Sequence, residues 1–255
     1  MIKVEPIPAF SDNYIWLVTT NEGSIVIDPG DANPVIEYLS KNKDLTLNSI
    51  LLTHHHYDHS GGIEDLRKRY DLKVFGPNNQ IKSVDHRVVE GDEILVNGLI
   101  FKIIEVPGHT LDHIAFYNDG DDDPILFCGD TLFAAGCGRV FEGTFDQMYE
   151  SLLKLKKLPE NTIVYSGHEY TTANLMFANH VEPLNKNIRD SLSKVQELRS
   201  KNIPTLPTSI KEEKLINPFL RCDDESLQII MRKKFNTDLS ELNIFSALRE
   251  WKDNF

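Results

Sequence analysis

The strongest constraint on this chain is the segment at residues 53–59, Thr-His-His-His-Tyr-Asp-His, which follows directly after an apolar, strand-like run. Five of its seven side chains are imidazoles or carboxylates, which suit Zn, Fe or Mn. Because side chains of a strand alternate between two faces, an extended backbone brings His54, His56 and Asp58 to one side and His59 to a neighbouring point. The segment predicts a metal site, and its geometry favours two metal ions.

The competing interpretation is a tag remnant or a solvated loop. This run is internal, however, and it is interrupted by an aspartate. Further apolar runs lead through Gly or Pro into a ligand-type residue; they span 103–109, 125–130 and 163–168, and they end at His109, Asp130 and His168. The repetition predicts that several strand ends deliver ligands to one rim.

The remaining histidines lack this context. His86 and His180 lie in polar surroundings, His55 points away by strand alternation, and His113 is ambiguous, so none of them is assigned as a ligand. Asp28, which follows another strand-like run, is predicted to support the site from behind the ligands.

The motifs Thr-His-x-His-x-Asp-His, Pro-Gly-His-Thr, Cys-Gly-Asp-Thr-Leu-Phe and Gly-His-Glu-Tyr resemble those of the metallo-β-lactamase superfamily. Over essentially the whole chain they resemble the bacterial branch of glyoxalase II, the hydroxyacylglutathione hydrolase family. The resemblance implies that one metal is bound by His54, His56 and His109, a second by Asp58, His59 and His168, and that Asp130 bridges the two.

Further segments of the chain resemble glutathione contacts of that family. They imply substrate binding by Arg139, Phe141, Tyr170, Arg249 and Lys252. The chain departs from the family in two ways. Arg139 and Phe141 stand where eukaryotic members carry Lys and Tyr, and Asp112 stands where the family has Gly.

The resemblance implies a thioester hydrolase that cleaves S-(2-hydroxyacyl)glutathione, such as S-D-lactoylglutathione, to glutathione and D-lactate, the second step of methylglyoxal detoxification. Two divalent metal ions, Zn with Fe or Mn as alternatives, would supply a hydroxide, which Asp58 and Asp130 would orient and deprotonate. The main alternative is a glutathione persulfide dioxygenase with a single iron. A β-lactamase and a zinc-stabilised binding module are further alternatives, but seven ligand positions exceed the four of a structural zinc site.

Composition narrows the class of protein. The chain has 255 residues, of which 40% are hydrophobic and 26% charged, as in an ordinary globular enzyme. No apolar run reaches membrane-spanning length and no leader is recognised, so we expect a cytoplasmic protein without membrane contact. Cys128, Cys137 and Cys222 fit no disulfide framework. A Cys137 nucleophile is disfavoured, because no histidine adjoins it.

A net charge of -12 argues against nucleic-acid binding. An anionic glutathione conjugate then needs a local basic cluster, for which Arg139, Arg249 and Lys252 are the candidates. With no heptad pattern, a monomer is expected.

The hydrophobic pattern predicts an α/β fold: a metallo-β-lactamase-like αββα sandwich domain over residues 1–169, followed by a small helical domain over 170–255. We expect no strand after Tyr170. The predicted elements are strands at 14–19 and 24–28, helices at 63–70 and 145–158, a long helix carrying Leu184, Ile188, Leu192, Val195 and Leu198, and another carrying Leu227, Ile230 and Met231.

Overall fold

The computed structural model describes residues 2–120, 123–235 and 240–255. The chain divides into two compact units that interleave along the sequence. The first unit contains Met1–Glu105, Asp112–Gly129 and Tyr165–His168, and the second contains Val106–Leu111, Asp130–Val164 and Glu169–Phe255. The predicted domain boundary after residue 169 stays a prediction.

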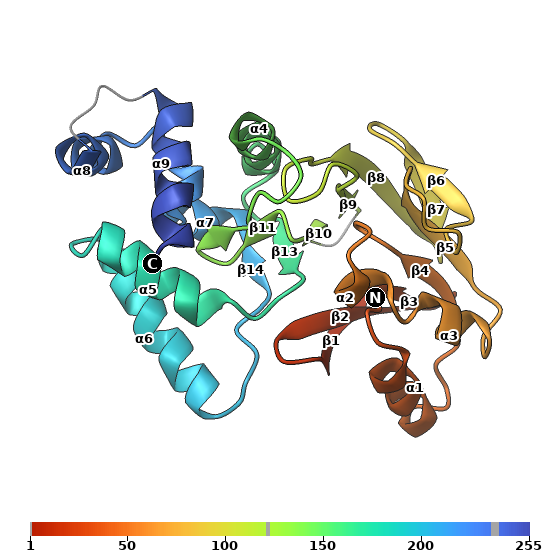
Figure 1. Cartoon of the computed structure of the whole chain (residues 1–255). Coiled ribbons are helices and arrows are strands. Elements are labelled where there is room, and N and C mark those ends of the chain that lie inside the picture. Colours follow the sequence, from red (N-terminus) through yellow and green to blue (C-terminus); the bar gives the residue numbers. More distant parts are fainter. Residues whose placement is uncertain (1, 121–122, 236–239) are drawn as a thin grey trace. The chain divides into compact units, whose positions relative to one another are not determined.

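The first unit contains a mixed sheet, coloured from red to yellow in Figure 1. Its strands, in spatial order, are β1 (Lys3–Ala9), β2 (Asn13–Thr20), β3 (Gly23–Ile27), β4 (Leu47–Leu51), β5 (Lys73–Pro77) and β6 (His86–Val88). Strands β1 to β3 are antiparallel neighbours, and β3 to β6 are parallel neighbours. Parallel strands are typical of a sheet covered on both faces.

Helices α1 (Ala32–Lys41) and α3 (Ile63–Arg67) pack on this sheet (Figure 1). Helix α1 begins at Asp31, whose side chain accepts a hydrogen bond from the backbone N–H of Asn33. The apolar faces of both helices share one buried core with the sheet, which includes Leu17, Val26, Val35, Leu39, Ile50, Ile63 and Leu66.

A second, antiparallel sheet of the first unit is formed by β7 (Glu93–Val96), β8 (Leu99–Glu105), β9 (Ile114–Asn118) and β10 (Ile125–Gly129). Aromatic rings fill the space between the two sheets. The ring of Tyr165 lies 4.8 Å from Trp16 of β2 and 5.0 Å from Phe127 of β10, measured between centroids. Tyr165 belongs to β13 (Ile163–Ser166), whose first two residues pair with β14 (Thr208–Ser209) in the second unit.

The second unit is mainly helical. It contains the hairpin β11 (Leu132–Phe133) and β12 (Gly136–Cys137), helices α4 (Phe145–Lys156), α5 (Thr171–Val181), α6 (Lys186–Ser200), α7 (Ile210–Ile216), α8 (Glu225–Phe235) and α9 (Glu241–Asp253), and the 3₁₀ helix η1 (Pro218–Leu220). Helices α5 and α6 lie side by side (Figure 1). Buried rings of Phe177, Phe219 and Phe245 form its aromatic core. Among the described residues, no helix has the length and apolar character needed to cross a membrane.

The α/β class and the helical C-terminal part predicted from the sequence are confirmed, with differences at element ends. The helix predicted over 63–70 ends at Arg67. The long helix begins at Lys186, because Asn185 caps its first N–H groups, and Leu184 lies before it, exposed. The expectation of no strand after Tyr170 is wrong, because β14 pairs with β13.

Candidate metal centre

The histidine-rich segment leaves the first sheet where β3 and β4 end. These strands are parallel neighbours, so their carboxyl ends lie at the same edge of the sheet. Asp28 follows β3, and Thr53 and His54 follow β4. Two residues far apart in sequence, Asp28 and Thr53, are thereby brought into hydrogen-bonding distance.

The ligand segment itself is not a strand. Residues 52–56 are irregular, and helix α2 (Tyr57–Ser60) then carries Asp58 and His59 on one turn. The prediction that strand alternation turns His54 and Asp58 to one side is therefore wrong in its cause, because β4 ends at Leu51 and the chain turns into a helix.

The turn of α2 is packed tightly against the loop that follows β3. A side chain at Gly30 would place its Cβ 1.8 Å from the carbonyl oxygen of Asp58, so only glycine fits there. The N–H of Gly62 donates to the carbonyl of Pro29 at 2.9 Å. Glycines on both sides thus let the two loops approach closely enough for Asp28 to reach the histidines.

The buried carboxylate of Asp28 organises two predicted ligands. Its Oδ1 accepts a hydrogen bond from Thr53 N–H, and its Oδ2 accepts one from the Thr53 hydroxyl, both at 2.7 Å. Oδ2 also accepts from Nδ1 of His59 at 3.1 Å. Because the Thr53 hydroxyl donates to Asp28, its oxygen accepts from Nδ1 of His54 at 3.0 Å. These contacts place Asp28 next to two predicted ligands, and its supporting role stays a prediction.

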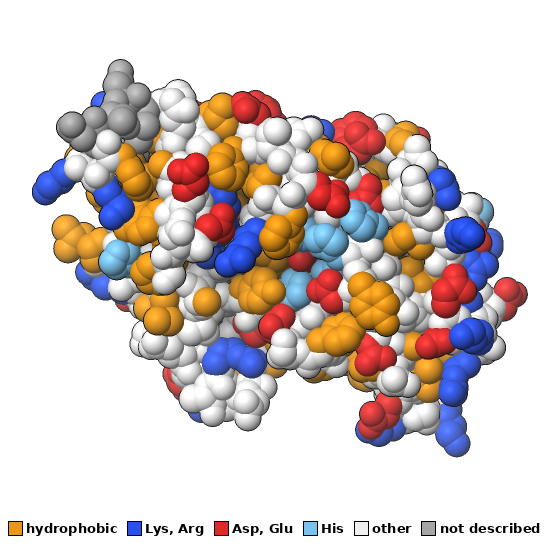
Figure 2. All heavy atoms as spheres, in the orientation of Figure 1, with side chains coloured by type: hydrophobic (Ala, Val, Ile, Leu, Met, Phe, Trp, Pro, Cys, Tyr) orange, Lys and Arg blue, Asp and Glu red, His pale blue; other side chains and the backbone are white. Residues whose placement is uncertain are grey.

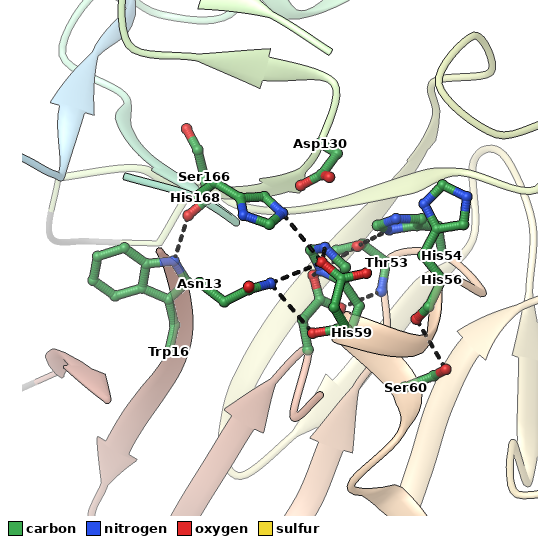
Figure 3. A network of polar contacts seen from close by, with 12 residues as sticks. Asn13, Trp16, Thr53, His54, His56, His59, Ser60, Asp130, Ser166 and His168 are labelled. Atoms are coloured by element: carbon green, nitrogen blue, oxygen red, sulfur yellow. Dashed lines mark hydrogen bonds and ion pairs between the residues drawn. The ribbon is translucent and has the colours of Figure 1, made fainter. Parts of the chain in front are cut away.

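Asp58, His59 and His168 of the first unit come together. His59 and His168 are labelled in Figure 3. Oδ2 of Asp58 lies 3.4 Å from Nε2 of His59 and 3.4 Å from Nε2 of His168. Backbone pairing of Asn13 with His168 holds the latter in the first unit. The sequence therefore predicted correctly that these distant ligand-type residues converge.

Two polar residues at the start of β2 complete this cluster, Asp12 in the β1–β2 turn and Asn13 as the first residue of β2, and no sequence pattern had identified them. Oδ1 of Asp12 accepts from Nδ1 of His168 at 2.7 Å, and Nδ2 of Asn13 donates to Oδ2 of Asp58 at 2.9 Å. Two adjacent polar residues between apolar strands gave a turn signal, but nothing local linked them to residues 45 and 156 positions away.

The neighbouring rings pack on one another. The ring centroid of His54 lies 4.8 Å from that of His56 and 4.2 Å from that of His59. His113, left ambiguous by the sequence, stacks on His54 at 4.5 Å with an interplanar angle of 13°. His113 is buried, and its ring supports the orientation of His54.

The other predicted ligands, His109 and Asp130, lie in the second unit. Both are buried, and Nε2 of His109 lies 3.4 Å from Oδ2 of Asp130. Nδ1 of His109 donates to the carbonyl oxygen of Arg139 at 2.8 Å. A Cβ at Gly138 would lie 2.0 Å from the carbonyl of Asp130, so the chain after the hairpin passes close to both residues.

This donor set fits divalent metal ions. Metal-binding histidines characteristically donate one ring N–H to an oxygen, which fixes the tautomer and directs the other nitrogen at the metal. The Nδ1 atoms of His54, His59, His109 and His168 all have such oxygen partners. Two ligand atoms on a tetrahedral zinc ion lie about 3.4 Å apart, whereas charge-assisted hydrogen bonds span about 2.7–2.9 Å. The 3.4 Å separations at Asp58 and Asp130 match the ligand geometry.

The electrostatics favour an ionised Asp58. Partial burial acts to raise the pKa of this carboxyl, but the neighbouring His168 and His59 rings and the hydrogen bond from Asn13 outweigh it and hold the pKa well below its usual range. Asp58 is therefore a carboxylate at neutral pH, as a metal ligand or proton acceptor must be.

Comparisons with known proteins agree with this geometry. The family model described as "Metallo-beta-lactamase superfamily" matches residues 9–168, and that described as "Hydroxyacylglutathione hydrolase C-terminus" matches 169–255. A curated protein of Vibrio campbellii, "Hydroxyacylglutathione hydrolase", is 49% identical over 259 residues, covering 100% of both chains. The chain belongs to the hydroxyacylglutathione hydrolase family.

Solved structures confirm the fold that this family membership implies. The structure of ETHE1 from Myxococcus xanthus has a TM-score of 0.65 and 28% identity, and 99% of each chain is covered. TTHA1623, solved in a di-iron-bound form, has a TM-score of 0.59 and 25% identity, covering 85% of this chain and 100% of that one. The metallo-β-lactamase fold and the hydroxyacylglutathione hydrolase resemblance predicted from the sequence are thus confirmed.

Exposed aromatic side chains occur in both units of this hydroxyacylglutathione hydrolase family member. Tyr57, next to His56 in the chain, is 76% exposed, and hydrophobic and histidine side chains both reach the surface on the face drawn in Figure 2. In the second unit, the exposed Phe141 lies 5.2 Å from the ring of His109, and Tyr170 contacts Phe133 at 5.2 Å. Phe141 thus lies beside a predicted ligand, and Tyr170 is positioned by an aromatic contact.

The three predicted basic contacts differ in accessibility. Arg139 is mostly exposed, 3.6 Å from a carboxylate oxygen of Asp253. Arg249 is only 2% exposed and donates to the Cys137 carbonyl at 2.9 Å and to Asp253 at 2.8 Å. Lys252 donates to Oδ1 of Asn174. Arg249 therefore donates hydrogen bonds to two protein groups, whereas Arg139 is exposed and has a longer ion pair with Asp253.

The burial of Lys252 predicts a pH-dependent stability. Burial, together with the nearby charge of Arg249, lowers its pKa from 10.5 to about 7. Between these values the unfolded chain binds more protons than the folded chain, so the free energy of unfolding rises with pH. We expect Lys252→Met to remove a slope of up to about 1 kcal/mol per pH unit in denaturant titrations at pH 7 to 9. Lys201→Met, at the exposed residue that follows α6, should leave the slope unchanged. An equal effect of both substitutions would contradict the assignment.

Asp112, where the family resemblance led us to expect glycine, has specific partners. Its Oδ1 accepts from Nδ1 of His55 at 2.8 Å, and its Oδ2 accepts from Nδ2 of Asn79 at 2.8 Å. His55 is thus bound by a carboxylate that is not among the predicted ligands, although its ring lies 5.1 Å from that of His56. Aspartate instead of glycine at position 112 therefore gives the histidine-rich segment an additional hydrogen bond, through His55, within the first unit.

Proposed function

We propose that the chain hydrolyses S-(2-hydroxyacyl)glutathione thioesters, such as S-D-lactoylglutathione, to glutathione and a 2-hydroxy acid, in the second step of methylglyoxal detoxification. The fold and its His/Asp clusters indicate divalent metal binding. We propose two ions, with Zn first and Fe or Mn as alternatives. The proposed ligands are His54, His56, Asp58, His59, His109, Asp130 and His168.

The single observation that carries this proposal is the oxygen atom found within hydrogen-bonding distance of Nδ1 in each of four histidines. Each has an oxygen acceptor at Nδ1: the Thr53 hydroxyl, Asp28, the Arg139 carbonyl or Asp12. Histidines that bind metal characteristically have such an oxygen at one ring nitrogen, which leaves the other nitrogen available to the metal. The di-iron form of TTHA1623 supports a two-metal centre in this fold.

The proposed reaction assigns different roles to the metal ions and to the two aspartates. Bound divalent ions supply Lewis acidity and, at neutral pH, hydroxide. Asp58, kept ionised by its neighbours, and Asp130 would orient the attacking hydroxide and would accept its proton at their carboxylate oxygens. The leaving thiol has an ordinary pKa of about 8.5, so no residue of the chain has to act as a strong general acid.

Substrate binding is proposed for Arg139, Phe141, Tyr170, Arg249 and Lys252. Exposed Phe141 offers an apolar surface next to His109. A glutathione carboxylate beside Lys252 would stabilise its ammonium form, offsetting the burial that lowers the pKa. Arg249, which donates to Asp253 and to the Cys137 carbonyl, would hold this basic region in place. We further propose a cytoplasmic monomer with reduced cysteines, in keeping with three buried free thiols.

The alternative function is a single-iron glutathione persulfide dioxygenase, suggested by the likeness to ETHE1. The convergence of Asp58, His59 and His168 favours a second metal and hydrolysis instead. Metal-replete protein should hydrolyse S-D-lactoylglutathione, seen as loss of ultraviolet thioester absorbance, without oxygen uptake and with sensitivity to chelators. Oxygen uptake with a persulfide substrate, and no thioester loss, would favour the dioxygenase.

A further inference from the structure

A network of buried polar side chains in the second unit forms hydrogen bonds with the backbone of the β11–β12 hairpin. The hairpin turns through Ala134 and Ala135, and Ala135 has a φ of +55°, a conformation that L-residues rarely adopt without outside support. Both turn residues are held by polar side chains: Asn174 donates to the Ala134 carbonyl at 2.9 Å, and the Ala135 N–H donates to Glu213 at 2.8 Å. The turn is therefore fixed by long-range hydrogen bonds.

Glu213, on α7, is completely buried yet belongs to none of the proposed catalytic or binding groups. Its Oε2 accepts from Ala135 N–H at 2.8 Å and from Nδ2 of Asn217 at 2.9 Å, and its Oε1 accepts from the Thr208 hydroxyl at 2.8 Å. Burial raises its pKa to about 7, against the lowering effect of these donors. A buried carboxyl is tolerated only when well satisfied, and this one is satisfied largely by the hairpin and by Asn217.

Asn217 forms hydrogen bonds with both strands of the hairpin. Its Nδ2 donates to the Gly136 carbonyl at 2.9 Å and to the Phe133 carbonyl at 3.3 Å. Its Oδ1 accepts from the N–H of Phe219, the second residue of η1. Asn217 and Glu213 thus act together on both strands and the turn.

The hairpin connects two groups that matter for the proposed metal centre. Asp130 lies two residues before β11, and Arg139 lies two residues after β12. The carbonyl of Arg139 is the acceptor that fixes Nδ1 of His109, and Gly138 N–H donates to the Thr131 carbonyl at 3.2 Å. A shift of the hairpin would therefore move Asp130 and the acceptor of His109 together.

We propose that Glu213 and Asn217 are positioning residues for the metal ligands His109 and Asp130, acting through the β11–β12 hairpin. The inference rests on the proposed function, because it takes these two residues as ligands. Residues that only stabilise the fold would affect metal binding only by unfolding the protein. Loss of Glu213 or Asn217 should instead weaken metal binding even where the protein remains folded.

The test compares Zn²⁺ affinity, measured by chelator competition well below each protein's melting temperature. Glu213→Leu removes the acceptor of Ala135 N–H and Asn217, and we expect about a 10-fold loss of Zn²⁺ affinity, at the low end of the effect of a residue behind a metal ligand. Glu213→Gln keeps an oxygen for both donors, while the Thr208 hydroxyl can turn to accept, so its affinity should stay within about 2-fold of wild type. Glu213→Leu should lower kcat while leaving KM nearly unchanged, and Glu213→Gln should resemble wild type in both.

Glu182→Leu is the matched control. Glu182 is also a buried carboxylate of the second unit, and among the described residues its carboxylate is paired with Arg221 at 2.6 Å instead of with the hairpin. The control should lose stability without losing Zn²⁺ affinity. If Glu213→Leu is insoluble, Asn217→Ser, which removes the donors to Gly136 and Phe133, should show the same loss.

Unchanged Zn²⁺ affinity in the folded Glu213→Leu or Asn217→Ser protein, or an equal loss in Glu182→Leu, would overturn the inference. Because the probe is the metal alone, the two proposals can fail separately. A wild-type protein that binds Zn²⁺ but leaves the thioester intact would overturn the proposed function only.

Discussion

Replacement of Asp130 by alanine is expected to remove bound metal and turnover together. The Asp130 carboxylate is buried, lies 3.4 Å from Nε2 of His109, and is the proposed bridge between two ions. Loss of a partner behind a metal ligand already lowers metal affinity or activity about 10- to 100-fold, so loss of a bridging ligand should lower kcat/KM by more than about 100-fold. Metal content, measured by mass spectrometry after gel filtration, and thioester hydrolysis should fall in parallel.

Asp146→Ala is the control for this experiment, since Asp146 is an exposed aspartate in the first turn of α4 in the same unit. It should retain metal and rate. An Asp130→Ala protein that kept its full metal content and rate would show that Asp130 is not a bridging ligand.

Asp28→Asn should lower metal affinity and kcat by about 10- to 100-fold without unfolding the protein. The two carboxylate oxygens of Asp28 face donors on both sides, from Thr53 and His59. An amide NH₂ in place of Oδ2 would meet those donors, which favours the His59 tautomer with its proton on Nε2 and so removes the ligand lone pair. Zn²⁺ affinity by chelator competition, with steady-state kinetics, measures the effect.

The same substitution three residues away provides the control. Asp31 accepts from the Asn33 N–H at 2.9 Å as the N-cap of α1, and asparagine is an equally good cap. Asp31→Asn should therefore match wild type. Equal Zn²⁺ affinities of Asp28→Asn and wild type would mean that Asp28 does not set the tautomer of His59.

The sequence was most informative where chemistry is local. Five ligand-type residues in a seven-residue segment predicted a metal site without knowledge of its geometry. Gly or Pro before His109, Asp130 and His168 marked strand ends, and the convergence of His168 with Asp58 and His59 followed. What the segment did not reveal was its backbone conformation, because an irregular stretch and one helical turn present ligands as effectively as a strand does.

Long-range polar partners were beyond sequence reasoning. Asp12 supports His168 across 156 positions, and Glu213 supports Ala135 across 78. Neither pair has a spacing that a helix or strand imposes. Arg249 illustrates the same limit: its spacing to Lys252 indicated a basic cluster, but its burial depends on Asp253 and the Cys137 carbonyl.

The most direct test of the metal-dependent hydrolase is a titration of metal-free protein with Zn²⁺ while the hydrolysis of S-D-lactoylglutathione is followed. We predict that chelator-stripped protein is inactive and that the rate rises until two equivalents have bound. Full activity in the stripped protein, or no hydrolysis after two equivalents have bound, would contradict the account.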